Sequence, residues 1–196
     1  MSDDHRAHHP VRVAPLPRGE WPDEAVDAIS ILPPVMQPAP GQEINSLSLL
    51  AHHPELAHEV LSLSLYLRFR STMSDRTREL LILRTAWLRG ARYELLRHAR
   101  LARRIGFTDE ELVRIARGPA APGWEPQEAL LLRAVDELCR DYRVADATWS
   151  ELAELHTVRE LMDILFTVGT YNMLAMAYNS MGLQPEADLP PFPPVD

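Results

Sequence analysis

The sequence predicts an all-α protein, a single-domain bundle of about seven helices. Apolar residues recur with the 3.6-residue period of a helix between residues 54 and 181, and capping residues and glycines separate the periodic stretches. No alternating apolar run bounded by turns indicates a strand. Hydrophobic residues make up 46% of the 196 positions, which is enough to build the core of one ordinary domain.

Proline-rich segments flank the predicted helical domain. Residues 1–43 form an N-terminal arm, in which four prolines between positions 33 and 40 exclude a long helix. The segment PDEAVDAISIL, Pro22 to Leu32, can still form a short one. The helical domain is predicted to span residues 44–183, followed by a proline-rich tail at 184–196. We expect both arms to lie over a core or over a neighbouring subunit, and flexible tails are the alternative.

Start and stop signals define the helices of the domain in chain order. Ser74 is placed to cap one helix, TDEE at Thr108 to Glu111 is a capping box, and TWSE at Thr148 is predicted to cap a third helix. Glycines at 90, 106, 118 and 182 mark helix ends. The predicted helices cover Pro54–Ser71, the stretch RTRELLILRTAWLRG after Ser74, Arg92–Ile105, the segment from the TDEE box to Gly118, Pro126–Tyr142, the segment opened by Thr148, and Val158–Met181.

Composition excludes several classes of function. With 28 acidic and 20 basic residues, the formal charge of −8 argues against a broad nucleic-acid-binding surface. No apolar run reaches the length of a membrane span, and no secretory signal is recognised, so we expect a cytoplasmic protein. Because Cys139 is the only cysteine, an internal disulfide and a cysteine-based zinc site are excluded. Cys139 is predicted to be buried. We expect no metal and no cofactor.

The stretch GARYELLRHAR, Gly90 to Arg100, contains the candidate site. Glu94 and His98 are four residues apart and therefore share one face of a helix, the apolar face that also carries Leu95. A Glu and a His on such a face are costly to bury unless they are paired. Either they satisfy each other in the core, or they line a pocket in which a proton moves between them and a ligand.

Three blocks of this chain resemble the carboxymuconolactone decarboxylase and alkyl hydroperoxidase D superfamily. They are LLAHHPELAHEVLSLSLYLR, then RTRELLILRTAWLRGARYELLRHARLARRIGFTDEELVRIARG, and last YNMLAMAYNSMGL, which together cover roughly Asn45 to Leu183. The resemblance implies an alkyl hydroperoxidase D-like, all-helical fold. It also implies a homo-oligomer, a trimer or a hexamer, with the site near subunit contacts.

The peroxidase branch of this superfamily carries a CxxC motif, a following His and an upstream Glu that acts in a proton relay. Aligned with this chain, the two cysteine positions fall on Ala91 and Glu94, the His on His98 and the Glu on Glu79. A peroxidase of this kind needs a thiolate to attack the peroxide and a second thiol to resolve the product. Because both cysteines are missing, thiol chemistry does not carry over.

The decarboxylase branch instead resembles this chain in having Glu and His at the positions of Glu94 and His98. Its reaction uses neither metal nor organic cofactor, and the resemblance implies catalytic roles for His98 as proton carrier and for Glu94 and Glu79 as its partners. Alternatively, Glu79 forms an ion pair with an arginine of its own helix. Tyr93 and Asn172 are candidate substrate-binding residues, although packing is the alternative for Tyr93.

The sequence therefore leads to one main hypothesis and two alternatives. The main hypothesis is a cofactor-free acid/base enzyme, a decarboxylase or other lyase or an isomerase, acting on a small organic acid, lactone or carbonyl compound. A peroxidase-like antioxidant protein is the first alternative and is disfavoured by the missing CxxC. The second is a non-catalytic ligand-binding or scaffold protein that keeps the fold.

Overall fold

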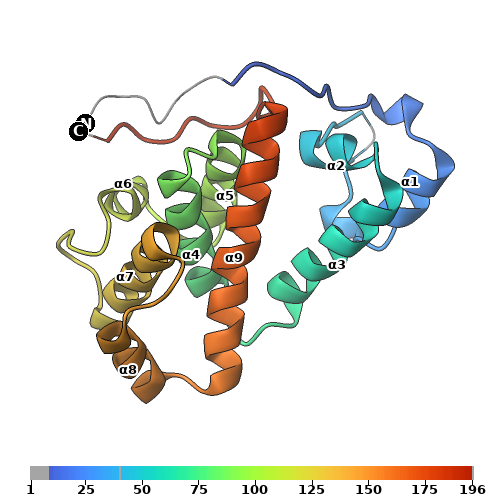
Figure 1. The fold of residues 1–196 in the computed structure, drawn as a ribbon. Helices are drawn as coiled ribbons and strands as arrows, with labels where there is room; N and C mark the ends of the chain where they lie inside the picture. Colours follow the sequence, from blue (N-terminus) through green and yellow to red (C-terminus); the bar gives the residue numbers. More distant parts are fainter. Residues whose placement is uncertain (1–8, 40, 196) are drawn as a thin grey trace. The chain divides into compact units, whose positions relative to one another are not determined.

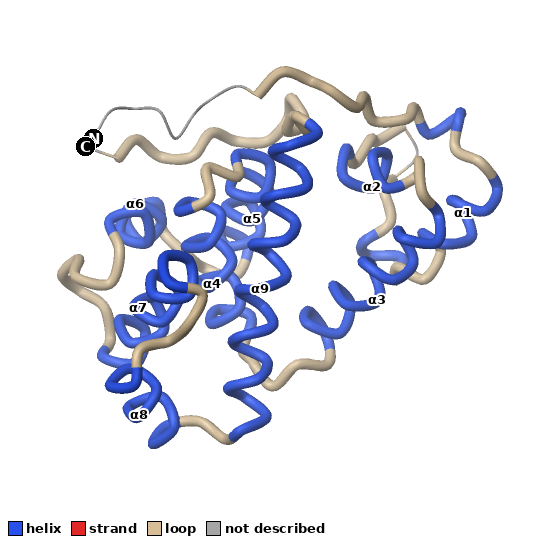
Figure 2. The backbone as a smooth tube through the Cα atoms, viewed as in Figure 1, coloured by secondary structure: helices blue, strands red, loops and turns tan. Residues whose placement is uncertain are grey.

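The fold was analysed in a computed structural model that describes residues 9–39 and 41–195 (Figure 1). Within these residues every regular element is helical, and Figure 2 shows helices joined by loops without a strand. The prediction of an all-α fold is therefore confirmed. The described chain contains the helices α1 (Asp23–Ile29), α2 (Asn45–Leu50), α3 (Pro54–Phe69), α4 (Asp75–Leu88), α5 (Arg92–Arg104), α6 (Asp109–Arg117), α7 (Pro126–Asp141), α8 (Asp146–Leu155) and α9 (Val158–Met181).

These helices form two compact units. Unit 1 contains residues 72–178 and 189–195, and unit 2 contains residues 9–39, 41–71 and 179–188. The predicted boundaries after residues 43 and 183 differ from these limits and stay a prediction about domain organisation. No helix in the described part of the chain has the length and apolar character needed to cross a membrane.

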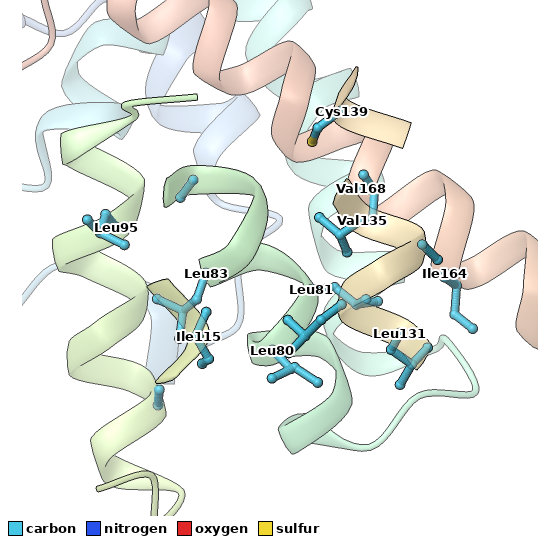
Figure 3. Packing of buried hydrophobic residues seen from close by; sticks show 14 of the residues in the cluster. Leu80, Leu81, Leu83, Leu95, Ile115, Leu131, Val135, Cys139, Ile164 and Val168 are labelled. Atoms are coloured by element: carbon cyan, nitrogen blue, oxygen red, sulfur yellow. The ribbon is translucent and has the colours of Figure 1, made fainter. Parts of the chain in front are cut away.

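Helix α4 is the centre of unit 1. It packs against α5, α6 and α7, and its four consecutive residues Leu80 to Leu83 are all fully buried. Four consecutive residues point to all sides of a helix, so this part of α4 lies inside the core. Figure 3 shows the leucines of α4 among side chains of α7 and α9, including Val135 and Val168. Polar groups on α4 are therefore held at fixed positions, since the helix cannot shift without disturbing this core.

A buried arginine joins three helices of unit 1. Arg84 on α4 makes a bidentate pair with Asp136 on α7, with nitrogen–oxygen distances of 2.6 and 2.9 Å. Its remaining nitrogen donates to the carbonyl oxygens of Ile115 and Ala116 at the end of α6. Gly118 follows with φ +98°, and a Cβ there would lie 2.7 Å from the guanidinium. The turn after α6 therefore needs glycine both for its backbone conformation and for the close approach of Arg84.

Unit 2 incorporates part of the proline-rich arm. Helix α1 and α2 both pack against α3, and Ala25, Ile29 and Leu32 share a buried cluster with residues of α2 and α3. The predicted short helix at Pro22 to Leu32 is present as α1, but α2 was not predicted. Its six residues are fewer than two turns, too short for the helical period to be recognised.

Part of the C-terminal tail lies on unit 1. Phe192 packs against Trp87 with a ring-centroid distance of 5.6 Å, and Arg103 donates to the carbonyl oxygen of Pro191. These contacts agree with the expectation that this arm covers a core. They also place Trp87 between the tail and the interior of unit 1.

The capping predictions were correct at two of three helices. Ser74 accepts from the Thr77 amide, and Thr108 forms the capping box with Glu111. Helix α8, however, begins at Asp146, so Thr148 is not its cap. Thr148 is buried and donates to Glu137, which also accepts the Ala145 amide. A carboxylate from another helix therefore caps α8, and a distant partner of this kind cannot be found from local spacing.

Candidate active site

The turn between α4 and α5 sets the position of the candidate site. Gly90 has φ +56°, a conformation that glycine adopts without strain, and it ends α4. Helix α5 then packs along α4 and turns Glu94 and His98 toward the interior, where both side chains are buried. The predicted shared face is therefore the inner face of α5, and its two polar residues need partners there.

Glu79 on α4 and Glu94 on α5 flank the imidazole of His98. The Nδ1 atom of His98 lies 2.7 Å from Glu79 Oε2, a hydrogen bond between buried groups. The Nε2 atom on the other side of the ring lies 3.4 Å from Glu94 Oε2. The structure thus brings all three predicted catalytic residues together, in the order carboxylate, imidazole, carboxylate.

The other partners suggested for Glu79 are engaged elsewhere or lie farther away. Arg76 pairs with Glu111 and Glu128, and Arg84 pairs with Asp136. Arg78 Nε is 3.9 Å from Glu79 Oε1, which is longer than the hydrogen bond to His98. The main partner of Glu79 is therefore His98, with the buried Arg78 as a second positive charge nearby.

The two carboxylates determine the charge of His98. Burial by itself lowers the pKa of an imidazole because the charged form loses its hydration. The hydrogen bond and charge of Glu79, and those of Glu94, outweigh this effect and raise the pKa of His98 from 6.5 to about 9. At neutral pH, His98 is therefore an imidazolium whose two N–H groups each face a carboxylate.

A tyrosine of α9 packs on this charged group. The ring of Tyr171 packs edge-to-face on the imidazole of His98, with 4.9 Å between ring centroids. Two turns further along α9, Tyr178 is buried, and burial together with the charge of Glu94 raises its pKa well above the ordinary value. The Tyr178 hydroxyl therefore stays protonated over the pH range in which His98 titrates, and it remains a possible hydrogen-bond donor.

Tyr93, predicted to bind substrate, is buried in this structure. Its ring packs edge-to-face on Tyr178 at a centroid distance of 5.8 Å. This is the packing role that the sequence analysis kept as an alternative. Tyr171 and Tyr178 were not predicted as site residues. Their separation of seven positions, which places both on one face of α9, was the available signal.

Asn172 lies in a different set of contacts from His98. Its Oδ1 accepts from Arg89 Nε at 2.5 Å, and Arg89 also donates to the main-chain carbonyl of Cys139. These bonds join the end of α4 to α7 and α9. Asn172 thus has a protein partner, and its predicted role in substrate binding stays a prediction.

The side chains of Glu79, His98 and Glu94 lie in a row and do not surround a common point. Each nitrogen of His98 has its own carboxylate, so Glu79 and Glu94 lie on opposite sides of the ring. Among the residues that the structure describes, no three His, Cys, Asp or Glu side chains are grouped to hold a metal ion. What the geometry can support is movement of a proton along the line from Glu79 through His98 to Glu94.

Comparison of the sequence with protein families gives one match. The model of the carboxymuconolactone decarboxylase family matches residues 54–137, a segment that contains all three residues of the line. No curated protein matches the chain in sequence. Over this segment the resemblance of the chain to the carboxymuconolactone decarboxylase and alkyl hydroperoxidase D-like superfamily is therefore confirmed.

Solved structures share the fold at low sequence identity. An uncharacterised peroxidase-related protein from Ralstonia eutropha JMP134, described as an alkylhydroperoxidase AhpD core, has a TM-score of 0.77 and 18% identity, over 92% of this chain and 95% of that chain. A peroxidase-related protein from Silicibacter sp. TM1040 has a TM-score of 0.75 and 16% identity, over 96% and 95%. A Cys-to-Ala variant of the debrominase Bmp8, in complex with 2,3,4-tribromopyrrole, has a TM-score of 0.71 and 15% identity, over 91% and 93%.

Replacing Glu79 with Gln is expected to lower the pKa of His98 from about 9 toward its ordinary value of 6.5. The amide keeps the shape of the side chain but removes the charge that stabilises the imidazolium. The measurement is a titration of the histidine side-chain nitrogens by NMR. The control is Glu160→Gln, which changes a carboxylate in the first turn of α9. An unchanged titration of His98 in Glu79→Gln would contradict the assignment.

Proposed function

We propose that this protein is a cofactor-free acid/base enzyme acting on a small organic acid, lactone or carbonyl compound. The observation that carries the proposal is the buried imidazolium of His98 held between two carboxylates. Perturbed ionisable groups of this kind are typical of sites where protons move. The superfamily supports an enzyme-like role, and the neighbour bound to 2,3,4-tribromopyrrole supports a small-molecule substrate.

Each residue of the line has a separate role in this proposal. His98 is the acid, because it carries its proton at neutral pH and can deliver it to carbon when an enolate forms. Glu79 keeps the imidazole charged and correctly oriented through the Nδ1 hydrogen bond. Glu94, on the Nε2 side, is the base that accepts a proton from the substrate or returns one to His98. Such a pair suits decarboxylation followed by protonation, and also isomerisation.

The imidazolium of His98 is the cation that an acidic group of a substrate would approach. Arg78 also lies near this line, 3.9 Å from Glu79, but its hydrogen bond of 2.5 Å is to Asp75. A substrate acid that approaches Nε2 of His98 competes with Glu94 for one N–H group. Tyr171, which packs on His98, would offer an aromatic ring beside the imidazole for contact with a small ring or chain.

The test detects proton transfer without assuming which reaction follows. The purified protein is incubated in deuterated water with a panel of small keto acids, lactones and cyclic ketones, and NMR follows both conversion and deuterium uptake at carbon. We expect turnover or exchange that is lost in His98→Gln and Glu94→Gln and kept in His156→Gln, a histidine outside the site. Activity that survives unchanged in His98→Gln would refute the proposal.

A peroxidase role remains the disfavoured alternative. Cys139 is buried, and burial raises the pKa of its thiol, although Arg89 opposes the effect. A thiol of this kind is a poor nucleophile toward peroxide. A homo-oligomer, a trimer or a hexamer, is part of the proposal, and a cytoplasmic location stays a prediction.

A further inference from the structure

Thr167 on α9 has a buried hydroxyl group without a hydrogen-bond partner. Its side chain is fully buried, and its Oγ1 atom forms no hydrogen bond with any group in the described part of the chain. A buried hydroxyl in this state is costly, because it has lost its hydrogen bonds to water and gained none in return. Each such group in a folded protein needs an explanation, and a ligand atom that completes its bonding is one.

Other hydroxyl groups in the helices of this chain have a local partner. The hydroxyls of Ser64 on α3, Thr85 on α4 and Ser150 on α8 each donate to the carbonyl oxygen four residues earlier. Serine and threonine commonly form this bond inside a helix. The hydroxyl of Thr167 does not form it, so its hydrogen remains available for another acceptor.

The neighbours of Thr167 along α9 lie inside unit 1. Ile164 and Val168 belong to its hydrophobic core, and Figure 3 shows both among side chains of α4 and α7. Valine has almost the volume of threonine and carries no group that needs a hydrogen bond. Packing alone therefore does not require a hydroxyl at position 167.

Thr167 lies one helical turn before Tyr171, the residue that packs on His98. Residues four apart are neighbours on a helix surface. A long side chain on a helix points back toward the N-terminus, so the ring of Tyr171 lies over the turn that carries Thr167. The centroid of the same ring is 4.9 Å from that of the His98 imidazole. The hydroxyl of Thr167 and the imidazole of His98 therefore both lie next to one aromatic ring.

The proposed reaction needs a hydrogen-bond donor in addition to His98. When Glu94 removes a proton from the carbon next to a carbonyl group, the electron pair of the C–H bond forms a C=C bond and the carbonyl oxygen becomes negatively charged. Decarboxylation gives the same enolate from the electron pair of the C–C bond. His98 bonds Glu79 through Nδ1 and delivers a proton to carbon from Nε2, so another donor must stabilise the oxygen.

We propose that Thr167 donates its hydroxyl hydrogen in a hydrogen bond to the enolate oxygen of the substrate. Thr167 keeps its proton throughout and stabilises the negative charge. The inference rests on the proposed function and narrows it, because the substrate must carry a carbonyl group next to the reacting carbon. Enolisable ketones, 3-oxo acids and lactones meet this requirement, whereas saturated acids without a ketone or lactone carbonyl do not.

Thr167→Val tests the inference, because valine keeps the size of the side chain and removes the hydroxyl. The assay in deuterated water gives kcat and KM for the compound of the panel that wild type converts. We expect kcat to fall by about 100-fold in Thr167→Val, with little change in KM, because the lost bond is strongest in the transition state. Thr167→Ser, which keeps a hydroxyl, should stay close to the wild-type kcat.

Thr85→Val is the matched control for stability. The hydroxyl of Thr85 has a partner, so we expect a lower urea midpoint for this variant and an unchanged kcat. Thr167→Val should show the opposite pattern, a reduced kcat with a urea midpoint equal to or above that of wild type, since it removes a buried group that lacks a partner. The NMR titration of His98 should be the same in both variants.

Three results would overturn the inference. A lower urea midpoint for Thr167→Val would mean that the hydroxyl has a structural partner. An unchanged kcat in Thr167→Val, together with loss of activity in His98→Gln, would remove the role of Thr167 and leave the proposed function intact. Absence of both conversion and deuterium uptake in wild type would refute the proposed function, and the inference with it.

Discussion

The free energy of unfolding is expected to fall by about 3 kcal/mol through His98 as the pH rises from 6.5 to about 9. The folded state holds the proton of His98 more tightly than the unfolded chain does. The stabilising effect is therefore complete below pH 6.5, the unfolded value, and is lost as the pH rises through the folded pKa. Urea unfolding followed by circular dichroism at several pH values measures it.

The comparison of variants isolates this contribution from that of other groups. His98→Gln should show a flatter dependence over the same interval, because the residue that takes up the proton is absent. His156→Gln should keep the wild-type slope. Equal slopes in all three proteins would contradict a raised pKa at His98. His98→Gln is also expected to be less stable than wild type at pH 7, since Glu79 and Glu94 then lack their shared cation.

Replacing Arg84 with Met is expected to destabilise the protein by about 3–5 kcal/mol, whatever the activity proves to be. The change removes the partner of Asp136 and leaves the carbonyl oxygens of Ile115 and Ala116 without the hydrogen bonds that the arginine donates. Urea unfolding at pH 7 measures the loss, with Asp136→Asn as a second variant of the same pair.

An exposed ion pair provides the contrast. Arg133 pairs with Glu151, and both side chains are well exposed. Arg133→Met should therefore change the free energy of unfolding by less than about 1 kcal/mol. If Arg84→Met and Arg133→Met cost the same, the buried network would not hold α4, α6 and α7 together as described.

The fold was largely predictable because most helices of unit 1 are long and strongly periodic. The short α2 lacked that signal, and α8 was misplaced because its cap, Glu137, comes from another helix. Within the site, the pairing of Glu94 with His98 follows from their spacing of four. The contact between Glu79 and His98 joins two helices across 19 positions, so only family resemblance suggested it. The contact of Tyr171 with His98 depends on how α9 packs, which periodicity cannot specify.

The reactivity of the buried Cys139 thiol can report how often the core of unit 1 opens. Its thiol lies within α7, packed into the core of unit 1, and its raised pKa keeps it protonated in the closed state. A disulfide reagent in solution can then modify it only when that part of the core separates, so the modification rate measures how often α7 is released. A cysteine introduced at an exposed position would be modified faster than Cys139, so its rate gives the reference for the reagent in the same protein.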